Sequence, residues 1–284
     1  MNAPPIGWDH PDTAHHYARF QRRFERYRQA NVALVRHAAL APGMRVLDVG
    51  AGDGGTAAAA LGHIGEGGTV LCFEPAAAMR ALGERTLREW RVTWTGRWPV
   101  GQLRFDRVLC GAAIWQFQWL EATLRRVFEL LRPGGCLCFD IPASYLGEPD
   151  PPGGGRDPLL FDLSASLVAE RALVQDAPST PPATSALTVE PTETETREQA
   201  LNSASVESML AAAGFRSQRW RFATRLSQRA YSEWLKIPPT TDRLFLGLDA
   251  GQRARMIDRA FERVDASSWR WERWIGWTAW KLPQ

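Results

Sequence analysis

Short apolar runs alternate along the chain with segments whose apolar residues recur every three or four positions. A bounded apolar run indicates a buried strand, whereas the longer period indicates a helix. Between residues 43 and 141 this alternation predicts an α/β fold with a doubly wound sheet and right-handed crossovers. The expected strands cover residues 45–49, 69–73, 92–95, 106–110 and 136–141, and the expected helices cover residues 56–61, 76–89 and 120–131.

Helical spacing also precedes this α/β segment. Tyr17, Phe20, Phe24 and Tyr27 form an apolar stripe, which predicts one or two helices over residues 13–40. After residue 142 we expect a loop at 148–158, a helix at 162–174 and a polar Thr/Pro/Glu tract at 178–196. Helices at 205–213, 229–237 and 249–264 and strands at 219–226 and 269–282 complete the expected pattern.

These patterns divide the chain into four expected parts. Residues 1–42 would form an N-terminal helical cap, and residues 43–141 would form the α/β core. Residues 142–202 form an insertion, and residues 203–284 complete the core while carrying a helical insertion at about 227–266.

A glycine-rich turn follows the first expected strand. Gly50, Gly52 and Gly54 precede an alanine-rich helix, so a ligand can approach the backbone N–H groups of the turn closely. Gly50, Gly52 and Gly55 also satisfy the G-x-G-x-x-G dinucleotide pattern. Glu74 stands about 20 residues further on, where an acidic residue binds ribose hydroxyls. The turn by itself therefore leaves NAD and S-adenosylmethionine open, since both carry a ribose.

Further patterns separate these two cofactors. Asp48 stands directly before the glycines, F-D-R-V begins at Phe105, and L-R-P-G-G begins at Leu131. Together with the acidic residue after the second strand, this order resembles the class I S-adenosylmethionine-dependent methyltransferases. In that family, D-x-G-x-G-x-G, an acidic end of strand two, F-D-x-V and L-x-P-G-G recur in the same order. The resemblance favours S-adenosylmethionine over NAD.

The resemblance implies a mostly parallel seven-stranded sheet whose antiparallel last strand lies between strands five and six. It also implies helical insertions that form a lid over the substrate pocket. Glu74 would accept hydrogen bonds from both ribose hydroxyls, and Asp48 would lie near the amino group of the cofactor. The other expected contacts of S-adenosylmethionine, and of its product S-adenosylhomocysteine, are Gly50, Gly52, Gly54, Pro75, Met79, Arg97, Trp98, Gly111, Ala112, Trp115 and Tyr17.

Some of these residues also have a purely structural interpretation. Glu74 fits an exposed loop carboxylate, Met79 fits a core position, and Trp115 fits either the fold or a place beside the sulfonium. The segment 95–99 lacks the carboxylate that the family often places near the adenine amino group. We therefore expect either that the backbone contacts the adenine and Trp98 stacks on it, or that this part of the pocket is altered.

The sequence assigns no general base. His16 and Tyr17 are the candidates, because relatives close the N-terminal helix over the cofactor. Trp8, Trp115 and Trp119 indicate an apolar or aromatic acceptor. We therefore expect O-, N- or C-methylation of a small molecule, of the kind found in specialised metabolism. A cofactor-binding protein without methyl transfer and a nucleic-acid or protein methyltransferase remain alternatives.

Composition and charge narrow the range of possible binding partners and cellular locations. The net charge is +3, and the arginines at positions 19, 22, 23, 26 and 28 have a helical spacing that indicates a solvated helix face rather than a nucleic-acid site. All four cysteines fall in expected strands, which indicates core thiols rather than a metal site. No apolar run reaches the roughly 18 residues of a membrane span, and no signal peptide is evident. We expect a cytoplasmic protein that binds neither metal, nucleic acid nor membrane, and its oligomeric state stays open.

Overall fold

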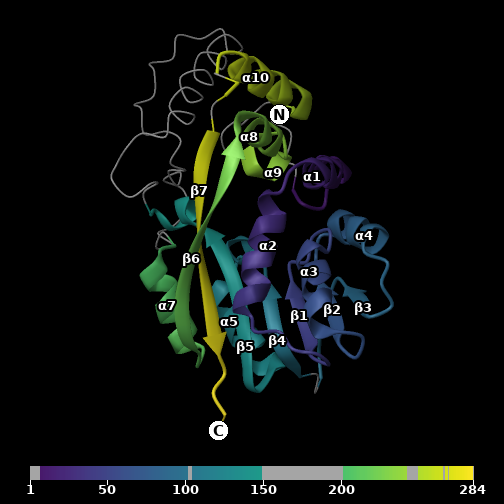
Figure 1. Cartoon of the computed structure of the whole chain (residues 1–284), viewed down its shortest axis with the longest axis vertical. Helices are drawn as coiled ribbons and strands as arrows, with labels where there is room; N and C mark the ends of the chain where they lie inside the picture. Colours follow the sequence, from purple (N-terminus) through teal and green to yellow (C-terminus); the bar gives the residue numbers. More distant parts are fainter. Residues whose placement is uncertain are drawn as a thin grey trace. The chain divides into compact units, whose positions relative to one another are not determined.

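The computed structural model describes residues 7–101, 104–148, 201–241, 249–264, 266–267 and 269–283. In this part of the chain a seven-stranded sheet is flanked by helices (Figure 1). The expected helix at 162–174 and polar tract at 178–196 lie outside the described residues, as do nearly all of the loop at 148–158 and most of the 142–202 insertion.

The observed elements agree closely with the periodicity of the sequence, and the first three strands have the expected bounds. In chain order they are α1 (Pro11–Arg23), α2 (Arg26–His37), β1 (Arg45–Val49), α3 (Gly55–Ile64), β2 (Thr69–Phe73), α4 (Ala77–Thr86), β3 (Val92–Thr95), β4 (Phe105–Cys110), η1 (Ile114–Gln116), α5 (Leu120–Leu130), β5 (Leu131–Pro142), η2 (Ala143–Leu146), α7 (Ser203–Ala212), β6 (Arg216–Ser227), α8 (Gln228–Leu235), α9 (Pro238–Thr241), α10 (Ala250–Glu262) and β7 (Trp269–Trp280).

The strand order confirms the expected fold. It is β3-β2-β1-β4-β5-β7-β6, with parallel pairing from β3 through β5 and antiparallel pairing of β7 with β5. The last strand therefore lies between β5 and β6. Between β1 and β4 the strand order reverses, and ligands of open α/β sheets bind at the carboxyl ends of strands at such a switch point.

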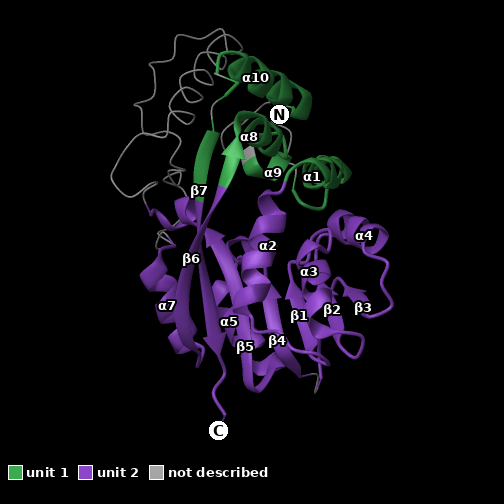
Figure 2. Ribbon diagram, viewed as in Figure 1, with its two compact units in different colours: residues 1–24, 149–200, 225–272 green, residues 25–148, 201–224, 273–284 purple. Residues whose placement is uncertain are grey.

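Two compact units divide the chain (Figure 2). Unit 2 comprises residues 25–148, 201–224 and 273–284, and it contains the parallel strands with α2–α5 and α7. Unit 1 comprises residues 1–24, 149–200 and 225–272, and its described elements include α1 and α8–α10. The sequence-based domain boundaries stay predictions.

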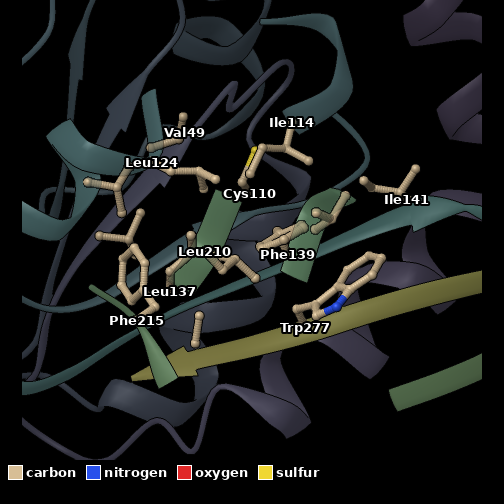
Figure 3. Close-up of a cluster of buried hydrophobic side chains, with 14 of the residues drawn as sticks. Val49, Cys110, Ile114, Leu124, Leu137, Phe139, Ile141, Leu210, Phe215 and Trp277 are labelled. Atoms are coloured by element: carbon tan, nitrogen blue, oxygen red, sulfur yellow. The ribbon is translucent and has the colours of Figure 1, made fainter. Parts of the chain in front are cut away.

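Unit 2 has one apolar cluster on each face of its sheet. Residues of α5 and α7 pack against one face, where Phe139 stacks on Trp277 with ring centroids 5.2 Å apart (Figure 3). Residues of α2 and α3 pack against the other face, around Leu109 and Cys138. The period of two along each strand sends alternate side chains to opposite faces, so the two clusters follow directly from the apolar strands.

Unit 1 has its own apolar core between α8 and α10. Tyr231, Met256 and Phe261 are buried there, and Lys236 pairs with both Glu233 and Asp258. The carboxylate of Glu233 also pairs with Arg19 of α1 at 3.4 Å. Apolar burial and charge pairing therefore hold the helices of this unit together.

The structure adds local detail to the expected elements. The fifth strand begins at Leu131 rather than at residue 136, because Leu131 pairs with Phe105 of β4. The register then shifts across the L-R-P-G-G segment, and pairing resumes between Arg107 and Cys136. The N-terminal stripe is divided between two helices, because Phe24 adopts an extended conformation between them. In the last strand Trp274 and Trp277 are core residues, whereas Trp269 and Trp271 are exposed.

The interpretation of the arginine run as a solvated face was wrong for one residue. Arg26 is only 5% exposed, and its guanidinium lies 4.5 Å from the ring centroid of Tyr27 and 5.0 Å from that of Trp274. Arg19, Arg22, Arg23 and Arg28 are exposed, as expected. A distant tryptophan of β7 thus buries one arginine of α2.

Candidate functional site

The site is built from the carboxyl ends of β1, β2, β4 and β5. After β1 the chain turns through three glycines with positive φ, namely Gly50 at 70°, Gly52 at 57° and Gly54 at 88°. Glycine adopts this conformation without the steric cost that a side chain incurs. Gly54 is the N-cap of α3 and supplies no capping side chain, so the turn presents backbone N–H groups at the start of a helix.

Space around the glycine turn is also limited. A Cβ atom built on Gly50 would lie 2.8 Å from Cβ of Ala113, and one on Gly54 would lie 3.2 Å from the ring of Trp94. Next to Gly52 the nearest atom is Cε of Met79, at 3.7 Å. A side chain at Gly50 or Gly54 would therefore crowd neighbouring side chains, so both positions require glycine for space as well as for the backbone angle.

Glu74 follows β2 and supports the same turn. Its Oε2 accepts a hydrogen bond from the Gly52 amide at 2.8 Å, and its Oε1 accepts one from the Ala76 amide at 2.9 Å. Its backbone oxygen accepts a hydrogen bond from Nη1 of Arg80 at 2.9 Å. Glu74 is only 7% exposed, so the alternative of an exposed loop carboxylate is wrong. A carboxylate has further lone pairs, so these contacts leave capacity to accept from a hydroxyl.

Asp48 lies below the glycine turn, in the last part of β1. The residue is fully buried, and neither carboxylate oxygen forms a hydrogen bond of normal geometry within the described residues. Burial raises the pKa of Asp48 to about 8; the Ala57 amide opposes the shift, and the charges of Glu74 and Asp53 add to it. A buried acceptor without such a hydrogen bond favours a bound cation or donor.

The segment after β4 forms the opposite wall. Ala112 has φ of +51°, and its amide donates to Oδ1 of Asp140 at 2.7 Å. A Cβ atom built on Gly111 would lie 2.6 Å from Oγ1 of Thr56 and 3.0 Å from Oδ1 of Asn31. Thr56 in turn donates to Asn31 at 2.9 Å. Two buried polar contacts and one close approach therefore fix the course of this segment.

Three carboxylates lie near Cys110, the last residue of β4, and affect the pKa of its thiol. The pKa of the Cys110 thiol lies well above its ordinary value, first because of burial and then because of the charges of Asp48, Asp140 and Glu74. Acidic side chains on or just after β1, β2 and β5 therefore lie near the end of β4. Such a region favours a ligand that carries positive charge.

Aromatic residues cover the side of the site next to β2 and β3. The ring centroid of Trp98 lies 4.3 Å from that of Phe73 and 6.2 Å from that of Phe117. Arg97 and Pro75 are exposed, whereas Met79 is buried. Stacking of Trp98 on adenine and contacts of Pro75, Met79 and Arg97 with the cofactor stay predictions.

A second aromatic pair follows the next two strands. Trp115 of η1 stacks on Tyr145 of η2, with ring centroids 5.0 Å apart at an interplanar angle of 24°. Trp119 is 66% exposed, just before α5. These rings occur after β4 and β5, and their predicted contact with an acceptor is untested.

His16 and Tyr17 lie on α1, in unit 1. Burial, followed by the charge of His15, lowers the pKa of His16. The hydroxyl of Tyr17 accepts a hydrogen bond from Nε2 of Gln21 at 3.3 Å, and its ring lies edge-on to Trp8. Their roles as catalytic candidates, and that of Tyr17 at the cofactor, stay predictions.

Sequence reasoning missed Asp140, Asn31 and Thr56. One signal was present, because Asp140 is the only charged residue in the apolar run C-L-C-F-D-I. Asn31 and Thr56 carry no comparable signal, since either residue is ordinary in an amphipathic helix. Their importance follows from how closely Gly111 approaches them.

Two further findings concern metal ions and membranes. In the ranges that the structure covers, no group of three or more His, Cys, Asp or Glu side chains is arranged to hold a metal ion. No helix in those ranges combines the length and the hydropathy that a membrane span requires.

Comparison with known proteins places these features in context. A family model described as a methyltransferase domain matches residues 20–218. A search of curated protein sequences found no significant match. Many solved structures share the fold.

Three of these structures illustrate the likeness. The YcgJ protein of Bacillus subtilis superposes with a TM-score of 0.55 at 15% identity, covering 90% of this chain and all of that one. A methyltransferase candidate from Bacillus halodurans gives 0.53 at 17% identity, covering 89% and 99%. The [4+2]-cyclase SpnF gives 0.53 at 15% identity, covering 90% and 82%. At these identities the likeness shows the fold alone.

Proposed function

Because the chain belongs to the family of class I methyltransferase domains, we propose that it transfers a methyl group from S-adenosylmethionine to a small-molecule acceptor. The observation that carries this proposal is the pairing of two buried carboxylates with the glycine turn at the switch point. Asp48 lies below the turn without a hydrogen bond of normal geometry, and Glu74 holds the turn from the end of β2.

The residues of this site fit S-adenosylmethionine. Gly50, Gly52 and Gly54 would accept the methionine portion against their backbone, since a glycine lets a ligand approach the main chain closely. Asp48 would lie near the ammonium group, which would favour its ionised form. Glu74 would accept hydrogen bonds from the ribose hydroxyls.

When bound, the sulfonium would supply an activated methyl group and a neutral thioether leaving group. Because the leaving group is good, the main tasks of the protein are to orient the partners and to exclude water. The three carboxylates near the end of β4 would favour a cationic cofactor in this place. An amine or an acidic phenol as acceptor would require no strong base from the chain.

The aromatic residues support a small apolar or aromatic acceptor. Trp115 and Tyr145 form a stacked pair after β4 and β5, and Trp119 is exposed close by in sequence. Aromatic faces bind planar or cationic groups favourably. The proposed acceptor class is therefore a small aromatic molecule or an amine.

A second candidate is a protein that binds the cofactor without transferring methyl. One structure with the same fold is named a [4+2]-cyclase, so the fold hosts more than one chemistry. Methylated product from an acceptor panel would exclude this candidate. Firm cofactor binding without product from any acceptor would support it.

Calorimetry tests the proposal directly. Titrations of S-adenosylmethionine, S-adenosylhomocysteine and NAD into the protein would be repeated with Glu74→Ala and with Glu84→Ala, an exposed carboxylate on α4. We expect micromolar binding of the first two ligands, lost in Glu74→Ala and kept in Glu84→Ala. Absence of binding, or preference for NAD, would refute the proposal.

A further inference from the structure

Ala112 has an unusual backbone conformation for its residue type. It directly follows Gly111 at the end of β4, and its φ of +51° lies in the left-handed region. A side chain makes this region unfavourable, so a non-glycine residue stays there only when its surroundings hold it. The support must come from contacts of Ala112 itself or of its neighbours.

Asp140 supplies such a contact from the neighbouring strand. Its Oδ1 accepts the Ala112 amide hydrogen at 2.7 Å, and the residue is fully buried in β5, which pairs in parallel with β4. Hydrogen bonds to an ionised acceptor are stronger than those between neutral groups. A buried acidic residue in an apolar strand is costly without a partner, and the Ala112 amide supplies one.

The conformation of Ala112 determines where the next residues lie. Ala113 leads into the short helix η1, and its Cβ occupies the space that a side chain on Gly50 would need. The ring of Phe117 lies next to the same glycine, 3.7 Å from the place of that Cβ. Residues 111–117 thus form the wall that faces the glycine turn.

We propose that Asp140 is a positioning residue, which holds residues 111–117 against the glycine turn through the Ala112 amide and so shapes the cofactor site. The inference rests on the proposed function, because it assigns the wall to the site of S-adenosylmethionine. Asp140 acts through the backbone of Ala112 and needs no contact with the cofactor or the acceptor.

Five variants separate this role from a general effect on folding. Asp140→Ala removes the acceptor oxygen, whereas Asp140→Asn keeps one. Ala112→Gly removes the steric cost of the positive φ, alone and combined with Asp140→Ala. Asp106→Ala is the matched control, because Asp106 is also buried and accepts a backbone amide, that of Arg45, at 2.7 Å at the opposite end of β4.

Calorimetry with S-adenosylhomocysteine is the first measurement. We expect Asp140→Ala to weaken binding about tenfold or more, and Asp140→Asn to stay within about threefold of the wild type. Ala112→Gly should restore most of the affinity in the Asp140→Ala background, since glycine adopts the left-handed conformation without support. Asp106→Ala should lower the melting temperature and leave the affinity within about threefold.

Hydrogen exchange supplies a measurement that needs no ligand. The peptide covering residues 111–117 should exchange faster in Asp140→Ala than in the wild type, whereas Asp106→Ala should not change it. If the wild type binds and all variants bind equally, the inference is wrong while the proposed function stands. If the wild type binds no S-adenosylhomocysteine, the proposed function is wrong, and the role of Asp140 at that site is refuted with it.

Discussion

Gly50 and Ala113 meet across the switch point of the sheet, where a Cβ atom on Gly50 would lie 2.8 Å from the Cβ of Ala113. The two residues follow adjacent parallel strands, β1 and β4. This close approach lies beside the glycine turn of the candidate site.

Gly50→Ala should therefore separate the two segments and weaken the binding of S-adenosylhomocysteine by about tenfold or more, because the new side chain is both crowded and strained at φ of 70°. Gly62→Ala is the control, since the interior of α3 has open space there and alanine favours a helix. Calorimetry on both variants measures the effect. Equal affinity of Gly50→Ala and wild type would refute the close approach.

Asp48 makes the stability of the ligand-free protein depend on pH. Burial raises its folded-state pKa to about 8, while the unfolded chain has a pKa near 3.8. Between these values the folded state holds a proton that the unfolded state has lost, so the free energy of unfolding falls as the pH rises. The fall is at most about 1.4 kcal/mol per pH unit.

Asp48→Asn removes this titration, so the variant should gain stability relative to the wild type as the pH rises from 5 to 8. Urea unfolding at several pH values measures the difference, and Asp9→Asn, an exposed aspartate, is the control. A constant difference across this range would show that Asp48 keeps an ordinary pKa.

Arg26 stabilises unit 2 through its contacts with aromatic rings. Arg26→Ala should lower the free energy of unfolding by about 1–2 kcal/mol, because the guanidinium packs on Tyr27 and Trp274 in a buried place. Arg28→Ala on the same helix should cost less than about 0.5 kcal/mol, since its pair with Glu25 is exposed. Urea unfolding compares the two, and equal losses would contradict the cation–π assignment.

The four cysteines should be unreactive in the folded protein. All four are buried free thiols, and burial raises the pKa of each, to about 11 for Cys136. Only the thiolate reacts readily, so a disulfide reagent at pH 8 should label almost no cysteine without denaturant and all four in urea. Rapid labelling of the native protein would show that one of these thiols is accessible.

The sequence predicts the parallel core well because each signal is local. The apolar run and the glycines after it define β1 and its turn, and Glu74 is recognised from its place after β2. The place of the last strand between strands five and six, which the family resemblance implied, is also confirmed.

The remaining features depend on residues far apart in the sequence. Arg26 is buried by Trp274, and Ala112 is held by Asp140, 28 positions away. Neither relationship leaves a periodic pattern, because each comes from packing between elements rather than within one. Likewise, the aromatic stripe from Tyr17 to Tyr27 has the spacing of one helix, although an extended Phe24 divides it.

The place of β7 sets an order for folding during synthesis. Strand β7 follows both of its neighbours along the chain, so β5 and β6 cannot be joined until its residues have left the ribosome. Until then β5 is an edge strand, and the backbone of its residues Cys136 to Pro142 can pair with strands of other chains. Lys281 completes the closure, since its backbone pairs with Gly134 and Gly135 and its Nζ donates to the carbonyl oxygens of Phe128 and Leu131 at the end of α5. Before β7 emerges, the nascent protein therefore exposes a strand edge that can pair with other chains.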